Sequence, residues 1–146
     1  TLQETERSAI IKSRIGQGVF RKELIKKYNS CCIITGINEK KLLIASHIKP
    51  YKDSNREEAF DVNNGLLLSK NTDSLFDLGY ITFNNDGTIC PSKVLSNDVI
   101  EHITQFRLNE HFINEKRLDY MAYHRAQVFE KRYNSYLAKK YIFEAV

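Results

Sequence analysis

Residues 42–79 read LLIASHIKPYKDSNREEAFDVNNGLLLSKNTDSLFDLG, and this stretch decides the fold of the chain. The apolar run at 42–48 predicts a buried strand, which Pro50 closes. Residues 51–63 are polar and charged, a composition typical of a loop. A second apolar run, at 66–68, predicts a second buried strand. The stretch therefore begins as a strand, a long loop and another strand.

The same stretch also has the signals of a turn and a short helix. Asn64-Gly65 is a dipeptide typical of turns, and it stands directly before the second strand. Residues 71–78 predict a helix, with Asn71 as its N-cap and Gly79 at its C-terminal stop. The central order is therefore strand, loop, strand, helix.

The upstream residues predict more helix. Residues 4–28 place apolar side chains at close to helical period, with basic side chains between them. Gly16 and Gly18 interrupt this pattern, so we expect two helical pieces joined by a short break. Residues 31–36 form a short apolar stretch that ends in a turn.

The downstream residues predict a hairpin and two further helices. Two short apolar segments, 80–83 and 88–90, flank a run of turn residues, which is typical of a β-hairpin. Helices are expected at 98–106 and from Glu115 to about Tyr141. The whole chain, 1–146, is therefore expected to be a single α+β domain with helices at both ends.

Composition and charge restrict the class of protein. Hydrophobic residues make up 42% of the chain and charged residues 27%, as in an ordinary globular domain and unlike a disordered or fibrous chain. No apolar run approaches the roughly 20 residues of a membrane span, and no signal-peptide pattern opens the chain. The net charge of +4 suits a polyanionic partner such as nucleic acid, but many unrelated proteins share it.

The cysteines favour a reducing compartment. Cys31, Cys32 and Cys90 form no CxxC pair, and an odd number argues against a disulfide framework. Cys32 and Cys90 stand in apolar surroundings and are expected to be small buried side chains. We therefore expect a cytoplasmic location.

Three side chains of the central stretch could carry chemistry together. His47 ends the first strand, and the i,i+4 spacing of Asp73 and Asp77 places both carboxylates on one helix face. Two such oxygens opposite a histidine could hold a hard divalent cation beside a base. Asp73 also fits an ordinary acid in the first helical turn, whereas Asp77 stands near a helix C-terminus, where a carboxylate needs a compensating cation.

The motifs of this stretch resemble those of the HNH endonuclease family, which has a ββα-metal finger. The resemblance rests on residues 45–50, 64–68 and 73–79. The flanks at 14–21 and 32–36, and Tyr123-His124-Arg125 with Phe129, are similar to those of HNH domains in bacterial restriction-type proteins. The resemblance covers roughly residues 14 to 129, with the finger core at about 42–79.

The resemblance implies roles for individual residues. His47 matches the general base that activates the attacking water, and Asn64 matches the middle asparagine, which bonds across the loop and holds the base. Asn64 before Gly65 also fits plain turn chemistry. Asp73 stands at the third motif position and Asp77 at the second metal-binding position on the helix.

Two departures from the family pattern bear on the metal. The third motif residue is an aspartate, and the position before the base, often a metal ligand, is Ser46. We therefore expect the ion to be coordinated by Asp73, Asp77, water and the phosphate. Oxygen ligands alone favour Mg²⁺ or Mn²⁺ over Zn²⁺.

Basic residues supply candidate phosphate contacts. These are Lys49, Lys52, Lys70, Arg14 and Arg21. The basic side chains of the first helical region, which include Lys12, also fit a plain solvated face. His124 and Arg125 lie on a predicted helix among aromatic residues and are expected to pack rather than to catalyse.

The expected function is metal-dependent hydrolysis of DNA phosphodiester bonds, in a setting of bacterial restriction or defence. Because the chain begins at Thr1, we expect it to be part of a longer protein that supplies DNA recognition elsewhere, and we leave a homodimer open. The alternative is a non-catalytic DNA-binding module that keeps the finger but has lost the metal.

Overall fold

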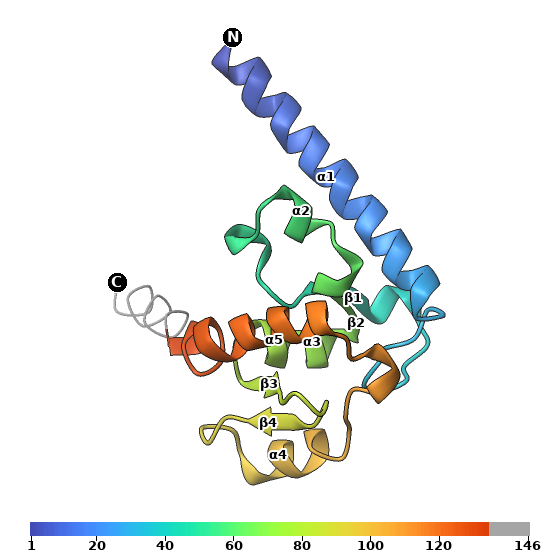
Figure 1. The fold of residues 1–146 in the computed structure, drawn as a ribbon, viewed down its shortest axis with the longest axis vertical. Helices are drawn as coiled ribbons and strands as arrows, with labels where there is room; N and C mark the ends of the chain where they lie inside the picture. Colours follow the sequence, from blue (N-terminus) through green and yellow to red (C-terminus); the bar gives the residue numbers. More distant parts are fainter. Residues whose placement is uncertain (135–146) are drawn as a thin grey trace.

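The computed structural model describes residues 1–134, which form an α+β fold (Figure 1). The helices are α1 (Leu2–Lys27), α2 (Arg56–Ala59), α3 (Lys70–Asp77), α4 (Asn97–Ile103) and α5 (Glu115–Gln127). The strands are β1 (Leu43–His47), β2 (Gly65–Ser69), β3 (Ile81–Phe83) and β4 (Ile89–Pro91). Short 3₁₀ turns lie at Lys40–Leu42 (η1), Tyr51–Asp53 (η2), Val62–Asn64 (η3) and Glu110–Phe112 (η4).

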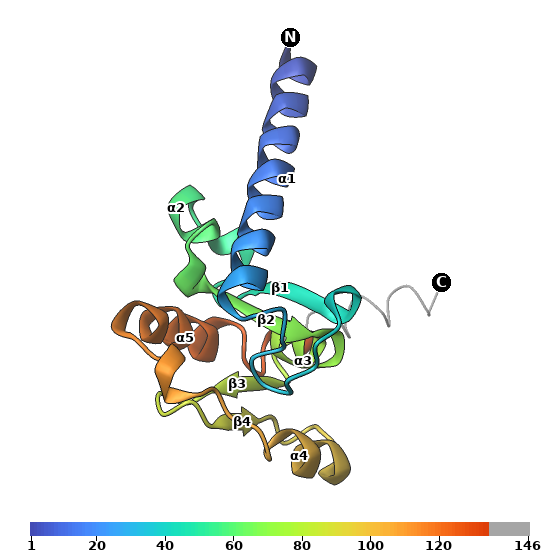
Figure 2. The same cartoon turned by 90° about the vertical axis from the view of Figure 1, so that its right-hand side faces the viewer.

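The central stretch forms the predicted two strands and helix. β1 and β2 pair antiparallel, with Leu43 opposite Ser69 and His47 opposite Gly65. Every residue of β2 is buried, and α3 packs against both strands (Figure 2). The predicted ββα finger is therefore confirmed, and residues 51–63, expected as a loop, contain only single helical turns.

The first helix differs from the prediction because it is one unbroken helix. A capping box between Thr1 and Glu4 starts α1, and the helix continues through both glycines to Lys27. Gly16 is needed for packing, since a Cβ there would lie 2.5 Å from the Phe60 ring. At Gly18 a Cβ would meet nothing within 4 Å, so no close contact requires glycine there, and the helix continues through it. Phe20 and Leu24 bury the C-terminal half of α1 in the core.

Two local predictions in the finger are wrong. Asn64-Gly65 is not a turn, because Asn64 ends η3 and Gly65 opens β2 with an extended φ of −122°. Glycine is required there by space, since a Cβ would lie 2.6 Å from the Phe20 ring. α3 begins at Lys70 with Ser69 as its N-cap residue, two residues before the predicted cap at Asn71.

The downstream hairpin is confirmed, with Thr82 paired to Cys90 in the β3–β4 ladder. α4 ends at Ile103, three residues earlier than predicted. α5 ends at Gln127, and Glu130 then takes a positive φ of 61° and donates its N–H to the Gly79 carbonyl. The predicted end of this helix near Tyr141 lies outside the described residues.

α5 is tied to the finger by a buried arginine. Arg117 is 1% exposed, and its guanidinium donates to the carbonyls of Asn63, Val62, Gly65 and Phe112 and to the Tyr28 hydroxyl. A buried cation needs all of its donors satisfied, and here backbone carbonyls satisfy most of them. α5 thereby fixes η3, the segment that presents Asn64.

The cysteines are free, with Cys32 buried and Cys31 and Cys90 half-buried. No helix among residues 1–134 has the length and apolar character to cross a membrane.

Candidate active site

His47, the last residue of β1, is held by a hydrogen bond from its ring. His47 Nε2 lies 2.8 Å from the carbonyl oxygen of Ala59, at the end of α2. A carbonyl can only accept, so Nε2 carries the proton and donates it. The lone pair of the neutral ring is therefore on Nδ1. This tautomer leaves one ring nitrogen free to accept a proton.

Aromatic side chains pack around the His47 ring. Phe20 of α1 stacks on it with centroids 4.5 Å apart and planes 10° apart, and Tyr51 meets it edge-on at 5.6 Å. Gly65, opposite His47 in the ladder, leaves the space that the Phe20 ring fills. Burial lowers the pKa of His47, although the Ala59 hydrogen bond and the charge of Asp77 oppose this. The ring is therefore kept neutral near pH 7.

Asn64 ties the connection between β1 and α2 together. Its side chain is 0% exposed; Oδ1 accepts from the Lys49 N–H at 2.8 Å, and Nδ2 donates to the Lys49 and Glu58 carbonyls at 3.2 and 3.0 Å. The Glu58 carbonyl immediately precedes the Ala59 carbonyl that binds His47. Asn64 thus bonds across the loop and fixes the segment that orients the His47 ring, which plain turn chemistry would not do.

Asp73 lies on α3 beside β1. Burial raises the pKa of its carboxyl, and the negative charge of Asp77 raises it further. The Ser46 hydroxyl, by hydrogen bonding, and the charge of Arg132 act in the opposite direction. Asp73 therefore sits between Ser46 of β1 and the last turn of α3, where negative charge is crowded.

Asp77 already has a cationic neighbour. Its Oδ1 accepts from Arg132 Nη1 at 2.9 Å, and its side chain is 48% exposed. The compensating charge expected at this helix C-terminus is thus supplied at least in part by an arginine. The ion pair is half-exposed and therefore weak enough to be exchanged for a stronger ligand.

The donor set fits a cation that takes most of its ligands from solvent and substrate. Within residues 1–134, no three His, Cys, Asp or Glu side chains lie close enough together to hold a metal ion by themselves. The two carboxylates of α3 are hard oxygen donors, the type that Mg²⁺ prefers while it keeps several waters. The negative charge of Asp77 beside the half-buried Asp73 is also what a bound cation would relieve.

The candidate phosphate contacts have different surroundings. Lys49 forms an ion pair with Glu58 at 2.8 Å, and Arg21 donates to the carbonyls of Leu43 and Lys40 at 2.7 and 3.0 Å. Arg14, Lys52 and Lys70 are exposed. Lys70 lies at the first turn of α3 and lines a cavity of about 780 Å³ whose walls include none of His47, Asp73 or Asp77.

His124 and Arg125 have structural surroundings, as expected. The His124 ring is buried, stacks on Phe76 at 3.8 Å, and bonds to the Thr82 hydroxyl and the Phe76 carbonyl. Arg125 donates to the Phe83 carbonyl.

Three residues of the site were not found from the sequence. Phe20 and Arg117 carry only the signals of an apolar and a basic helix residue, and Arg132 reaches Asp77 through the turn at Glu130. The i,i+4 spacing of Phe20 and Leu24 marks a core face, but it does not say that a histidine lies under it. No local signal identifies the other two.

β1, β2 and α3 form a ββα finger, with His47 at the end of β1 and two carboxylates on α3. Residues 32–84 match the family model described as HNH endonuclease. The resemblance predicted from the sequence is therefore confirmed over this segment, which contains β1, β2 and α3. The match supports a nuclease.

Among solved structures, one described as the modification dependent TagI restriction endonuclease is similar, with 21% sequence identity and a TM-score of 0.49. The similarity covers 76% of this chain and 37% of that chain, so this chain spans little more than a third of its length. No curated protein matches this chain.

Proposed function

We propose that this domain is a divalent-metal-dependent endonuclease that hydrolyses DNA phosphodiester bonds. The observation that carries the proposal is the His47 ring: Nε2 is committed to Ala59, and Nδ1 is free on the segment that matches the HNH endonuclease family. The charge of Asp77 acts on the same ring. Asp77 is therefore within electrostatic reach of the proposed base.

The chain's own residues provide the base and its support. His47 Nδ1 takes a proton from a water molecule as the water oxygen bonds to phosphorus and the bond to the leaving sugar oxygen breaks. The Ala59 carbonyl stabilises the imidazolium that forms. Asn64 acts as a positioning residue, because it holds the Glu58–Ala59 segment.

Asp73 and Asp77 would hold the cation, Mg²⁺ or Mn²⁺, with water and a phosphate oxygen completing its shell. When bound, a cation of this kind supplies Lewis-acid stabilisation of charge on the phosphate and the leaving oxygen. Lys52 and Arg14, which are exposed, are proposed to contact DNA phosphates. Weaker phosphate contacts are proposed for Lys49, Lys70 and Arg21. We also propose that recognition of a DNA sequence lies elsewhere in a longer bacterial restriction or defence protein.

The test is cleavage of plasmid DNA by the purified chain. His47→Ala is expected to lower the rate at least about 10²-fold, since general-base catalysis contributes about 10²–10⁴. His111→Ala, which removes an exposed histidine of η4, is the matched control and should cleave at the parent rate. EDTA should abolish cleavage, and Mg²⁺ or Mn²⁺ should restore it. Undiminished turnover by His47→Ala would exclude this residue as the base.

A second candidate is a DNA-binding module without catalysis. It is favoured by the Asp77–Arg132 ion pair, which occupies one of the two carboxylates, and by Ser46 in place of a ligand. A non-catalytic module would bind DNA but would not cleave it at any metal concentration, so the same plasmid assay separates the two functions.

A further inference from the structure

A groove of about 430 Å³ lies between α1 and the segment that carries α2. Its α1 side extends from Lys12 to Glu23 and includes Ile15 and Val19, and Phe60 lies on its other side. Ile15 and Val19 are 62% and 50% exposed, although their side chains are apolar. Within residues 1–134 nothing covers this apolar surface, so it is available to a partner.

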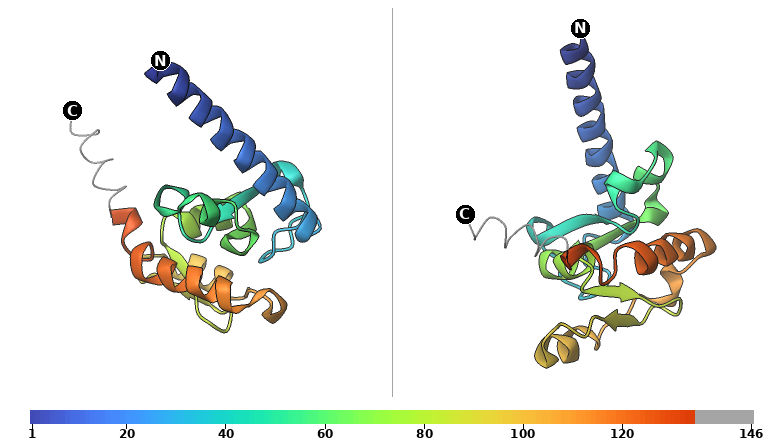
Figure 3. Two further views of the ribbon diagram at one scale, coloured as in Figure 1. Left: turned by 45° about the horizontal axis from the view of Figure 1, so that its top comes forward. Right: turned by 90° about the vertical axis from the view of Figure 1, so that its left-hand side faces the viewer.

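The N-terminal part of α1 has little packing of its own. Figure 1 and the two views of Figure 3 show α1 leaving the body of the molecule as a single rod that ends at the N-terminus. In the part of the chain that the structure describes, the first α1 side chain that hydrogen-bonds to another element is Ser13, which bonds to Tyr51. A helix of about 12 residues is only marginally stable alone in water. A second helix packed along the rod would therefore stabilise it.

The charge of the rod does little to repel a second copy of the chain. Residues 2–19 contain three cations, Arg7, Lys12 and Arg14, and two acids, Glu4 and Glu6, so their net charge is only +1. Successive residues of an α-helix are about 100° apart around the axis, so Arg14 lies about 160° from Lys12. Arg7 precedes Arg14 by two turns and lies on the same side as Arg14. Both arginines therefore lie away from the groove.

The α1 face of the groove has a self-complementary pattern of charge. Lys12 and Glu23 are about three turns apart and lie on one face, with Ile15 and Val19 between them. They are roughly 16 Å apart along the axis and cannot pair with each other. Among residues 1–134 neither of them forms an ion pair. A second α1 in the antiparallel direction would bring Glu23 against Lys12 at both ends, as a two-fold axis requires.

We propose that this groove binds α1 of a second copy of the chain, antiparallel, in a two-fold symmetric dimer. Lys12 of each copy meets Glu23 of the other. In that register Val19 of each copy lies opposite Gly16 of the other and enters the groove beside Phe60. A parallel helix would bring Lys12 against Lys12, so the charges select the antiparallel direction. The dimer goes beyond the proposed function and does not depend on cleavage.

The first test changes the apolar surface and measures the dimer by sedimentation velocity of the full chain over a range of concentrations. Ile15→Asp is expected to raise the dimer dissociation constant at least about tenfold, because it buries a charge in the interface. Ile10→Asp is the matched control. Ile10 is 54% exposed on the same helix and lies about 180° around the axis from Val19. It should dimerise like the parent.

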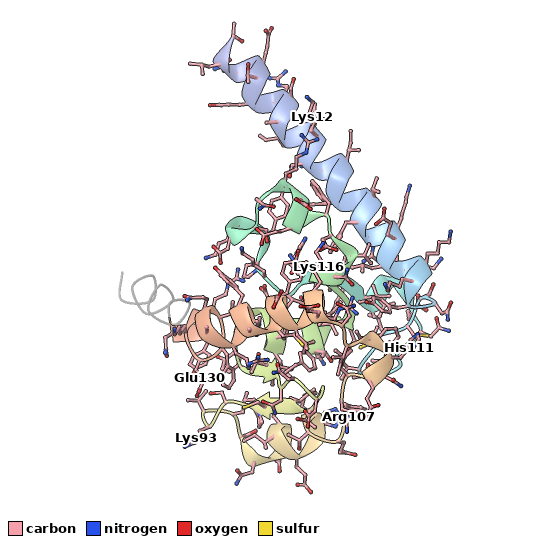
Figure 4. All side chains as sticks on the ribbon, in the orientation of Figure 1. Lys12, Lys93, Arg107, His111, Lys116 and Glu130 are labelled. Atoms are coloured by element: carbon pink, nitrogen blue, oxygen red, sulfur yellow. The ribbon has the colours of Figure 1, made fainter. Side chains whose placement is uncertain are left out.

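The second test reverses the charges one at a time. Lys12→Glu and Glu23→Lys should each raise the dissociation constant about tenfold, because each replaces two attractive pairs by two repulsive ones. An equimolar mixture of the two variants should form a heterodimer with nearly the parent affinity, since every pair then has opposite charges again. Figure 4 shows Lys12 on α1 and Lys93 at the opposite end of the molecule, so Lys93→Glu is the control for charge alone.

A chain that stays monomeric up to about 1 mM would overturn the proposal. So would equal effects of Ile15→Asp and Ile10→Asp, or a mixture of the two charge variants that stays monomeric. These outcomes are independent of the nuclease function. A dimer that does not cleave plasmid DNA leaves the interface standing, and a monomer that cleaves it leaves the nuclease function standing.

Discussion

His47 is prepared as a base by one hydrogen bond and by burial, without a carboxylate partner on its ring. The Ala59 carbonyl selects the tautomer, and the stacked Phe20 ring packs on one face of the imidazole and limits its rotation. Because a neutral acceptor fixes the proton on Nε2, the orientation of the base depends on the loop that Asn64 holds.

The pH dependence of cleavage follows from the His47 pKa. Burial lowers this pKa below its ordinary value of 6.5, and the neutral ring is the active form. At saturating metal, we expect kcat/KM to be independent of pH above pH 6.5. Below the lowered pKa of His47, it should fall about tenfold per pH unit. A decrease in kcat/KM already between pH 8 and pH 7 would contradict the assignment of His47 as the base.

Arg132 pairs with Asp77 and would therefore compete with the proposed metal ion for this carboxylate. We expect Arg132→Gln to lower the metal concentration needed for half-maximal cleavage, because it frees the Asp77 carboxylate. Asp77→Ala and Asp73→Ala should each raise that concentration. Lys131→Gln, the neighbouring cation, is the control and should leave it unchanged. If Arg132→Gln also leaves it unchanged, Asp77 belongs to the ion pair and not to the metal.

α1 combines two glycines with different surroundings in one continuous helix. Gly16 is packed under Phe60, whereas Gly18 faces open space. The loop that carries Phe60 also carries Ala59, so the contact at Gly16 connects the long helix to the His47 hydrogen bond.

The two glycines therefore predict opposite effects of alanine. Gly18→Ala should raise the free energy of unfolding by about 0.5–1 kcal/mol, because alanine loses less conformational entropy in a helix. Gly16→Ala should lower it by about 1–3 kcal/mol, because its Cβ would lie 2.5 Å from the Phe60 ring. It should also slow cleavage. Urea unfolding followed by circular dichroism measures both, and a gain for both variants would contradict the packing at Gly16.

α3, β3 and α5 meet at His124, which makes their packing sensitive to acid. Burial lowers the His124 pKa from 6.5 to about 4, although the Phe76 carbonyl opposes this. The unfolded chain binds this proton below pH 6.5 and the folded chain only near pH 4, so stability is complete above 6.5 and is lost as the pH falls.

The loss amounts to about 3 kcal/mol over that interval, at about 1.4 kcal/mol per pH unit shifted. Urea unfolding at several pH values measures it. His124→Gln should flatten the dependence of the unfolding free energy on pH by about this amount, relative to the parent. A dependence of equal slope in both proteins would mean that other groups cause the acid sensitivity.

Charge is distributed unevenly over the molecule, with the excess on α1 and none in sum elsewhere. In the proposed function the finger holds the scissile phosphate and contacts the DNA backbone, and such contacts carry no base identity. Sequence readout usually needs roughly 1,000 Å² or more of surface that reaches the groove edges.

The isolated domain is therefore expected to cut DNA with little sequence preference. Its affinity should fall steeply between about 50 and 200 mM salt, and equally for random and defined duplexes. Gel analysis of the products and anisotropy on both duplexes measure this. A discrete ladder of fragments, or tight binding of one sequence at the higher salt, would show that recognition lies within these residues.

The sequence alone was enough to predict the elements of the finger and its candidate residues. Apolar runs and a short helical period locate β1, β2 and α3, and the order of His47, Asn64, Asp73 and Asp77 identifies the motif. These signals are local, since strand and helix periodicity and motif spacing depend only on neighbours along the chain.

The tertiary structure alone decided which partners each of these residues has. Gly16, Gly18 and Gly65 were interpreted as breaks or turns, yet α1 is continuous and Gly65 is extended. At Gly16 and Gly65, space for the Phe60 and Phe20 rings rather than backbone freedom requires glycine. The Ala59 acceptor of His47, the Arg132 partner of Asp77 and the burial of Arg117 involve residues far apart in sequence. Packing sets such contacts, and local periodicity carries no information about them.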